Sequence, residues 1–154
     1  MFHQNQKIME KLKKITLNDV PGGYAMCSRG DCAACNHCLR HIAFQEVGKD
    51  LKMLYQVNPL RVVPSDKCEY FRTDEPATYA RGFKNMQQSM TPPQYQTFSY
   101  RLISKFGRTG YFERRRGERL CSPSEIEAIR NVLLEIDLPD LEFDGYQKQY
   151  NWWD

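Results

Sequence analysis

Residues 24–41 read YAMCSRGDCAACNHCLRH and hold four of the chain's six cysteines, at the spacing Cys27-x4-Cys32-x2-Cys35-x2-Cys38. A fifth cysteine, Cys68, follows in the sequence DKCEYF. These five thiols are one more than a four-ligand metal site needs, and four-cysteine sites usually hold structural zinc or an iron–sulfur cluster. The stretch therefore predicts a metal site that ties residues 27–38 to Cys68.

Two sets of ligands fit these spacings. One takes Cys27, Cys32, Cys38 and Cys68 and leaves Cys35 spare. The other replaces Cys38 by Cys35, which is close to the plant-type ferredoxin spacing of C-x4-C-x2-C with a remote fourth cysteine. Zinc is expected before an iron–sulfur cluster, because it is the commoner occupant of small four-thiolate sites and tolerates irregular spacing.

Other interpretations of these side chains stay open. Either His37 or His41 could replace a thiolate as a ligand, and cysteines are also common as ordinary buried residues. Cys38 near a helix N-terminus, with His41 one turn further on, could be an activated nucleophile, although no third group to orient the pair is evident. Cys121 directly precedes a helix cap and is expected to be structural.

Length and composition are those of a single globular domain. The chain has 154 residues, 12% of them aromatic, and no apolar stretch long enough for a signal peptide or a membrane span. We expect one domain over 1–154, with a cysteine-rich half over 1–72 and a helical half over 73–154. A cytoplasmic location is expected, where clustered cysteines indicate metal ligands before disulfides.

Two short motifs, TPPQ at 91–94 and SPSE at 122–125, predict the starts of helices. Each combines an N-cap hydroxyl, a proline in the first turn and a Gln or Glu that closes a capping box. The first helix is expected to end at Gly107. The second is expected to span 123–136.

Apolar spacing predicts three more helices, over 4–15, from Cys38 to Val47, and over 76–90. Residues 51–57 and 60–71 are expected to be extended, and the aromatic tail should pack back on the domain. The predicted fold class is mainly α with minor β (α+β), as a small helical domain clamped by the four-cysteine site.

The basic segment, residues 101–119, carries seven basic residues against two acids, and the sign of the charge reverses from residue 120 onward. This region resembles the second half of a helix-turn-helix repressor. A helix that ends in glycine is followed by the sequence RTGYFERRRGER and then by a proline-capped helix. A β-hairpin over 111–114 and 119–121 is the competing local structure. The candidate nucleic-acid contacts are Arg108, Arg114, Arg115, Arg116 and Arg119, against the alternative of a solvated charged surface.

Motifs along nearly the whole chain carry a resemblance to a known family. They are C-x4-C-x5-C-L-R from residue 27, C-x-Y-F from 68, F-G-R from 106, R-R-G-x-R from 115 and S-P-x-E from 122. In these motifs the chain resembles an uncharacterised family of short bacterial proteins, a domain of unknown function. The resemblance implies no known activity. It implies that the metal ligands are Cys27, Cys32, Cys38 and Cys68, with Cys35 as an extra thiol and alternative ligand.

The sequence favours a small metal-stabilised protein, with zinc as the expected metal, that binds DNA or RNA and acts in regulation. An iron–sulfur redox or sensor protein is one alternative, and a module that binds a protein partner is another. No Gly-rich phosphate loop, pair of catalytic carboxylates or Ser/His/Asp constellation stands out, so a non-enzymatic role is favoured over catalysis.

Overall fold

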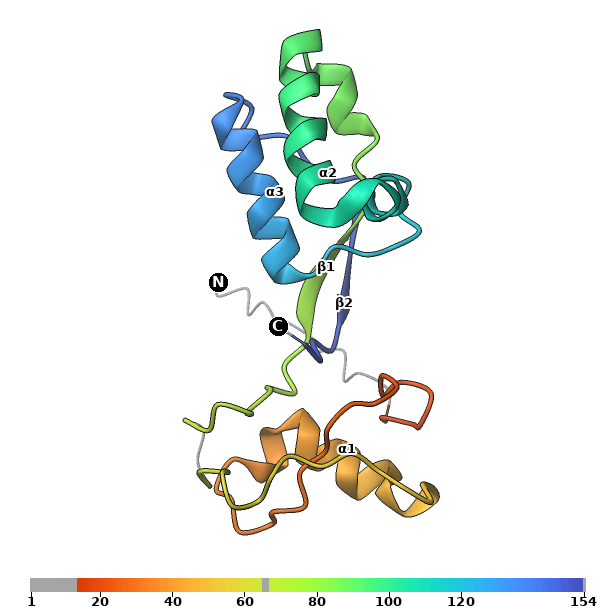
Figure 1. Cartoon of the computed structure of the whole chain (residues 1–154), viewed down its shortest axis with the longest axis vertical. Helices are drawn as coiled ribbons and strands as arrows, with labels where there is room; N and C mark the ends of the chain where they lie inside the picture. Colours follow the sequence, from red (N-terminus) through yellow and green to blue (C-terminus); the bar gives the residue numbers. More distant parts are fainter. Residues whose placement is uncertain (1–13, 65–66, 154) are drawn as a thin grey trace, which may run out of the picture. The chain divides into compact units, whose positions relative to one another are not determined.

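The structure, a computed structural model, describes residues 14–64 and 67–153. The chain forms two compact units, Met1–Asp74 and Glu75–Asp154, drawn from red to yellow-green and from green to blue in Figure 1. Helices dominate and one two-stranded antiparallel sheet accompanies them, so the α+β class is confirmed. The helix expected over 4–15 lies almost entirely outside the described residues.

The first unit is built around the helix α1, Leu39–Val47. A 3-10 turn, η1 (Cys35–His37), precedes it, and a second, η2 (Gly48–Asp50), follows it. The expected helix between Cys38 and Val47 is confirmed, with Cys38 in extended conformation as its N-cap. The segments expected to be extended, 51–57 and 60–71, form no strand in their described parts, and a single bridge joins Gln56 to Met26.

The second unit contains the sheet, in which β1 (Ala77–Arg81) pairs antiparallel with β2 (Gly145–Gln149) and Ala80 lies opposite Tyr146. The helix predicted over 76–90 is therefore wrong. Its residues form β1 and a 3-10 helix, η3 (Asn85–Ser89). The apolar residues of 76–90 have helical spacing, but Ala77–Arg81 pair with a strand far away in sequence. Gly82, at φ 72°, then turns the chain away from the strand.

Both capping boxes are present, at Thr91 for α2 (Pro92–Arg115) and at Ser122 for α3 (Pro123–Glu135). The helix α2 is broken at Gly107, which has φ 73° and ψ 162°, values that glycine adopts without strain. The helix then resumes for two further turns, so the alternative β-hairpin over 111–114 and 119–121 is wrong. Cys121 instead bridges to Ala80 of β1.

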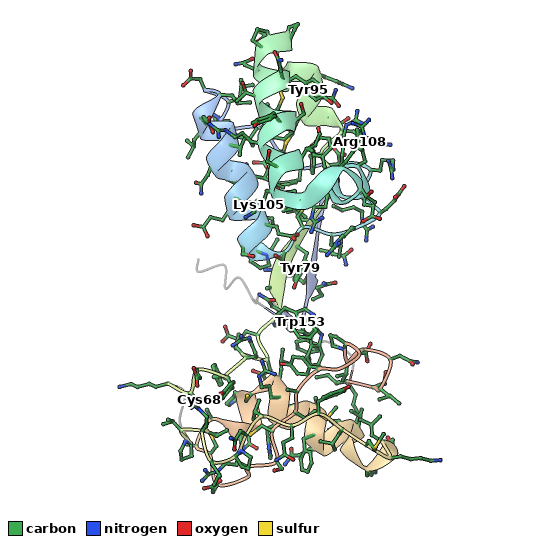
Figure 2. All side chains as sticks on the ribbon, in the orientation of Figure 1. Cys68, Tyr79, Tyr95, Lys105, Arg108 and Trp153 are labelled. Atoms are coloured by element: carbon green, nitrogen blue, oxygen red, sulfur yellow. The ribbon has the colours of Figure 1, made fainter. Side chains whose placement is uncertain are left out.

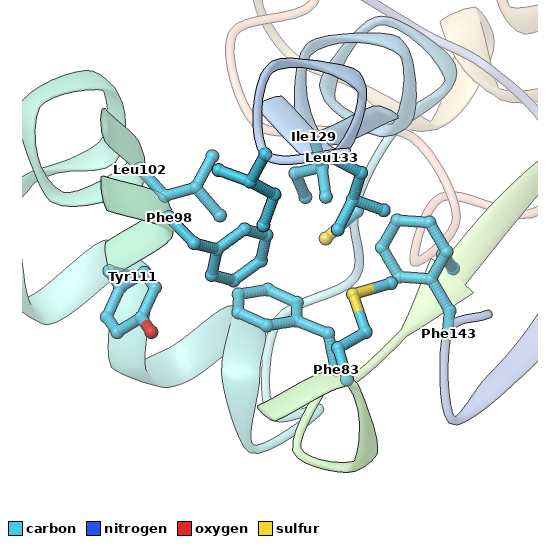
Figure 3. Close-up of a cluster of buried hydrophobic side chains, with 11 residues drawn as sticks. Phe83, Phe98, Leu102, Tyr111, Ile129, Leu133 and Phe143 are labelled. Atoms are coloured by element: carbon cyan, nitrogen blue, oxygen red, sulfur yellow. The ribbon is translucent and has the colours of Figure 1, made fainter. Parts of the chain in front are cut away.

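The core of the second unit lies between α2, α3 and the sheet (Figure 3). The ring of Phe83 lies 5.8 Å from that of Phe98 and 5.7 Å from that of Tyr111. Phe143 is buried as expected for the tail, whereas Trp153 is 61% exposed. Within the described residues, no helix combines the length and the apolar character that crossing a membrane requires.

Candidate metal centre and basic groove

Five cysteines of the first unit line one small pocket, which we call the cysteine pocket. They are Cys27, Cys32, Cys35, Cys38 and Cys68. All five are free thiols. The pocket has a volume of about 20 Å³, which is room for about one water molecule or one ion. The structure thus brings Cys68, labelled in Figure 2, to the N-terminal cysteines.

Arg40 of α1 ties together the segments that carry the first and the last of these cysteines. Its Nε donates to the carbonyl of Tyr70 and one Nη donates to the carbonyl of Ala25, each at 2.7 Å. The guanidinium also lies 4.7 Å from the centre of the Tyr24 ring. Arg40 follows Cys38, the N-cap of α1, by two residues. This buried cation therefore fixes the segments around Cys27 and Cys68 to the helix that begins after Cys38. Sequence reasoning noted Arg40 only as part of a motif.

Backbone hydrogen bonds complete the arrangement around α1. The amide of Cys27 donates to the carbonyl of Arg40 at 3.0 Å, and the amide of Leu39 donates to the carbonyl of Arg72 at 2.7 Å. The 3-10 turn before α1 closes with the amide of Cys38 donating to the carbonyl of Cys35 at 3.3 Å. These bonds hold the cysteines in place without using their thiols.

The pKa of Cys27 is influenced by other thiols of the pocket. Burial is the main cause that raises the pKa of Cys27, and the neighbouring thiolates of Cys38, Cys68 and Cys32 raise it further, against a lowering backbone hydrogen bond from Arg29. Cys35 is absent from this group. Its Sγ instead lies 3.8 Å from the carbonyl of Gly30 and 3.8 Å from Oδ1 of Asn36.

The two histidines near the cysteines differ in their surroundings. His41 is 3% exposed and lines the pocket, and its Nδ1 lies 2.9 Å from the carbonyl of Cys27. Its Nε2 is buried and has no hydrogen-bond partner. The side chain of His37 is 76% exposed and lies 3.6 Å from Asp74. Of the two, only His41 is available to the cysteine pocket.

The thiols surround the pocket but do not already stand at coordination distance. Among residues 14–64 and 67–153, no three side chains of His, Cys, Asp or Glu are arranged closely enough to hold a metal ion. A bound ion would have to draw its ligands inward, to about 2.3 Å for zinc and sulfur. Binding of an ion would therefore require the pocket to contract.

Arg114, one of the candidate nucleic-acid contacts, is buried. It is 4% exposed, its Nη2 lies 2.5 Å from Oε1 of Glu125, and its Nη1 donates to the carbonyl of Gly110 at 3.0 Å. Its guanidinium lies over the ring of Phe106, 4.2 Å from the centre. Arg114 therefore has little surface to offer a phosphate and holds α2 to the start of α3 instead.

The other four arginines of the candidate set divide into two pairs. Arg115 donates to the side chain of Gln87 at 2.7 Å, and Arg116 forms an exposed ion pair with Glu118 at 2.7 Å. Arg108 lies over the ring of Phe112 at 5.6 Å. The side chains of Arg108 and Arg119 have no ion pair within the described part of the chain.

A second, open depression lies where α2 meets the start of α3, and we call it the basic groove. Its volume is about 440 Å³. It is lined by Lys105, Phe106, Arg114, Arg119, Ser124 and Glu125. Lys105 was counted in the basic segment but not chosen as a contact from the sequence, because only the fold shows that it shares a groove with Arg119.

A family model described as a family of unknown function, DUF6078, matches residues 9–152, and the chain therefore belongs to this family. The resemblance indicated by the sequence motifs is confirmed. No curated protein and no solved structure matches the chain. The chemistry of the two sites consequently follows from their own residues.

Proposed function

We propose that this member of the DUF6078 family is a zinc protein, with the ion bound in the cysteine pocket and a second unit that binds nucleic acid. The proposed zinc ligands are Cys27, Cys32, Cys38 and Cys68. The observation that carries the proposal is the gathering of five thiols around one small pocket, four from residues 27–38 and the fifth from Cys68, which lies 30 positions after Cys38.

The choice among the thiols is supported by their surroundings. Cys38, Cys68 and Cys32 are the neighbours that act on Cys27, while Cys35 is directed to Gly30 and Asn36. Four thiolates around one zinc ion carry a double negative charge. Arg40 lines the same pocket and offsets part of that charge, whereas Arg29, which also lines it, is paired with Asp31 at 2.5 Å.

Zinc is proposed before an iron–sulfur cluster because it is the commoner occupant of small four-thiolate sites. It also tolerates the irregular spacing of these cysteines. An iron–sulfur redox or sensor protein is accordingly the alternative that the experiment below must exclude.

The experiment is elemental analysis and visible spectroscopy of the full chain, purified with and without oxygen. We expect one zinc per chain and no colour. Cys68→Ser should lose most of the zinc, whereas Cys121→Ser should keep it, because Cys121 is buried in the other unit. Iron with sulfide would replace the proposal by a cluster protein, and a metal-free, fully folded chain would remove the metal altogether.

Nucleic-acid binding is the proposed role of the second unit, and unpaired cations favour it. Arg108, Arg119 and Lys105 are exposed, and no hydrogen bond or ion pair engages their side chains within the described residues. Arg115 and Arg116 have polar partners but remain partly accessible. Positive charge that is not neutralised internally is what attracts a phosphate backbone.

The test is fluorescence anisotropy with labelled single-stranded DNA, duplex DNA and RNA at low salt. Binding that weakens steeply as salt rises is expected. If none of the three binds, the second unit has another partner, and a protein-interaction module becomes the better proposal.

A further inference from the structure

We propose that the basic groove is a binding site for a phosphate group of the nucleic-acid backbone, held chiefly by Lys105 and Arg119. The inference rests on the proposed nucleic-acid binding and names the place where the backbone is held. The shared chemistry is that of a phosphate, which a nucleic-acid strand or a free phosphate compound can supply.

The groove exists because α2 is broken at Gly107. Lys105 and Phe106 come from the end of the first helical part of α2, and Arg114 comes from the part after the break. Arg119 comes from the turn that follows, and the start of α3 supplies the remaining wall. Figure 2 shows Lys105 on the side of α2 next to α3. Cations distant along the chain thus border one open space of about 440 Å³.

Two cations of the groove have no ion-pair partner in the described part of the chain. Arg114 and Glu125 neutralise each other through two hydrogen bonds, Nε to Oε2 at 3.2 Å and Nη2 to Oε1 at 2.5 Å. Lys105 and Arg119 have no hydrogen-bond or ion-pair partner for their side chains within residues 14–64 and 67–153. Both remain exposed to solvent. An anion in the groove would therefore meet positive charge that no carboxylate of the described residues neutralises.

The lining favours contact with the backbone of a strand over contact with its bases. Phe106 is the aromatic ring of the groove, and cations already lie over it, with Arg114 at 4.2 Å and Lys105 at 6.0 Å from the ring centre. The ring is consequently not offered to a stacking base. Contacts made only to phosphate carry no sequence information, so this site should bind strands irrespective of sequence.

The test compares two double variants with the same loss of charge. Lys105→Ala/Arg119→Ala removes the unpaired cations of the groove. Lys14→Ala/Arg101→Ala is the matched control, because these two cations are exposed but paired with Glu46 at 3.0 Å and Glu135 at 2.7 Å. Binding of a labelled single strand of mixed sequence is measured by anisotropy between about 50 and 200 mM salt.

We expect the groove variant to lose at least about tenfold in affinity at the lowest salt, and its salt slope to fall by about 0.7, the value for one lost phosphate contact on a single strand. The control variant should change by less than about twofold, and both should keep the melting temperature of the wild type. Equal losses in the two variants, or an unchanged groove variant, would overturn the inference while leaving nucleic-acid binding in place.

A second arm uses pyrophosphate as the probe and follows backbone amide resonances of the full chain. Resonance shifts confined to the C-terminal half of α2 and the start of α3, and absent from the groove variant, would support the site even if no strand binds. In that case the proposed nucleic-acid function would fail and a free phosphate compound would be the ligand. Without such shifts and without strand binding, the inference fails as well.

Discussion

Replacing Arg114 by alanine tests whether this arginine belongs to the interior of the second unit or to its binding surface. The side chain of Arg114 is 5% exposed and that of its partner Glu125 is 22% exposed. Removing one member of a buried ion pair costs about 3–5 kcal/mol, because the other charge stays buried without a partner. Since water still reaches part of Glu125, we expect a loss near the lower end, about 3 kcal/mol.

Two further contacts of Arg114 add to the expected loss of stability. Arg114→Ala also removes the hydrogen bond to the carbonyl of Gly110 and the packing of the guanidinium on Phe106. For a unit of about 80 residues, a loss of about 3 kcal/mol corresponds to a fall in melting temperature of about 12–24 °C. Arg114→Lys keeps the charge but not the two-pronged contact, and should fall between the wild type and the alanine variant.

The assay is urea unfolding of the full chain followed by tryptophan fluorescence. Both tryptophans, Trp152 and Trp153, belong to the second unit, so the signal reports on that unit. Arg116→Ala is the control, because its ion pair with Glu118 is exposed and should contribute at most about 0.5 kcal/mol. If Arg114→Ala costs less than about 1 kcal/mol and instead weakens nucleic-acid binding, the interior role assigned to Arg114 is refuted.

Further predictions concern other parts of both units. Cys32→Ser should lose zinc affinity while Cys35→Ser keeps it, and the opposite result, measured by competition with a chromophoric chelator, would favour the alternative ligand set. Gly107→Ala should destabilise the second unit by about 1–3 kcal/mol, because the pair φ 73° and ψ 162° lies in a region essentially restricted to glycine. Nothing lies within 4 Å of the added methyl group, so an unchanged melting temperature would count against the strain. Burial raises the pKa of Cys121 to about 12, so almost no thiolate exists at pH 8. Iodoacetamide should therefore modify Cys121 only after unfolding, as mass spectrometry of peptides can show, and rapid labelling of the folded chain would contradict its burial.

Local chemistry explains what the sequence predicted well. The capping boxes at Thr91 and Ser122 are closed by side chains three residues away, so the information for each helix start lies in four residues. The gathering of the cysteines was predicted for a similar reason, because the thiols of the N-terminal cluster are close in sequence and Cys68 had few other partners.

Long-range pairing explains what the sequence left undetected. Residues 76–90 have helical spacing, and only the distant segment Gly145–Gln149 makes residues Ala77–Arg81 a strand. Arg114 lies in a run of three arginines that looks solvated, yet Gly110 one turn earlier leaves room for its side chain and Glu125 supplies the opposite charge. The four-residue spacing of Gly110 and Arg114 was the available signal, since it puts these two on one helix face after the break at Gly107.

The central claim is that one zinc ion is bound by four thiolates in the cysteine pocket. X-ray absorption spectroscopy at the zinc edge of the protein as isolated tests it most directly, because the first coordination shell gives the number and type of ligands. We predict four sulfur ligands at about 2.3 Å. A shell of three sulfurs and one nitrogen at about 2.0 Å would contradict the four-thiolate set and indicate His41, and a protein that contains no zinc would contradict the claim itself.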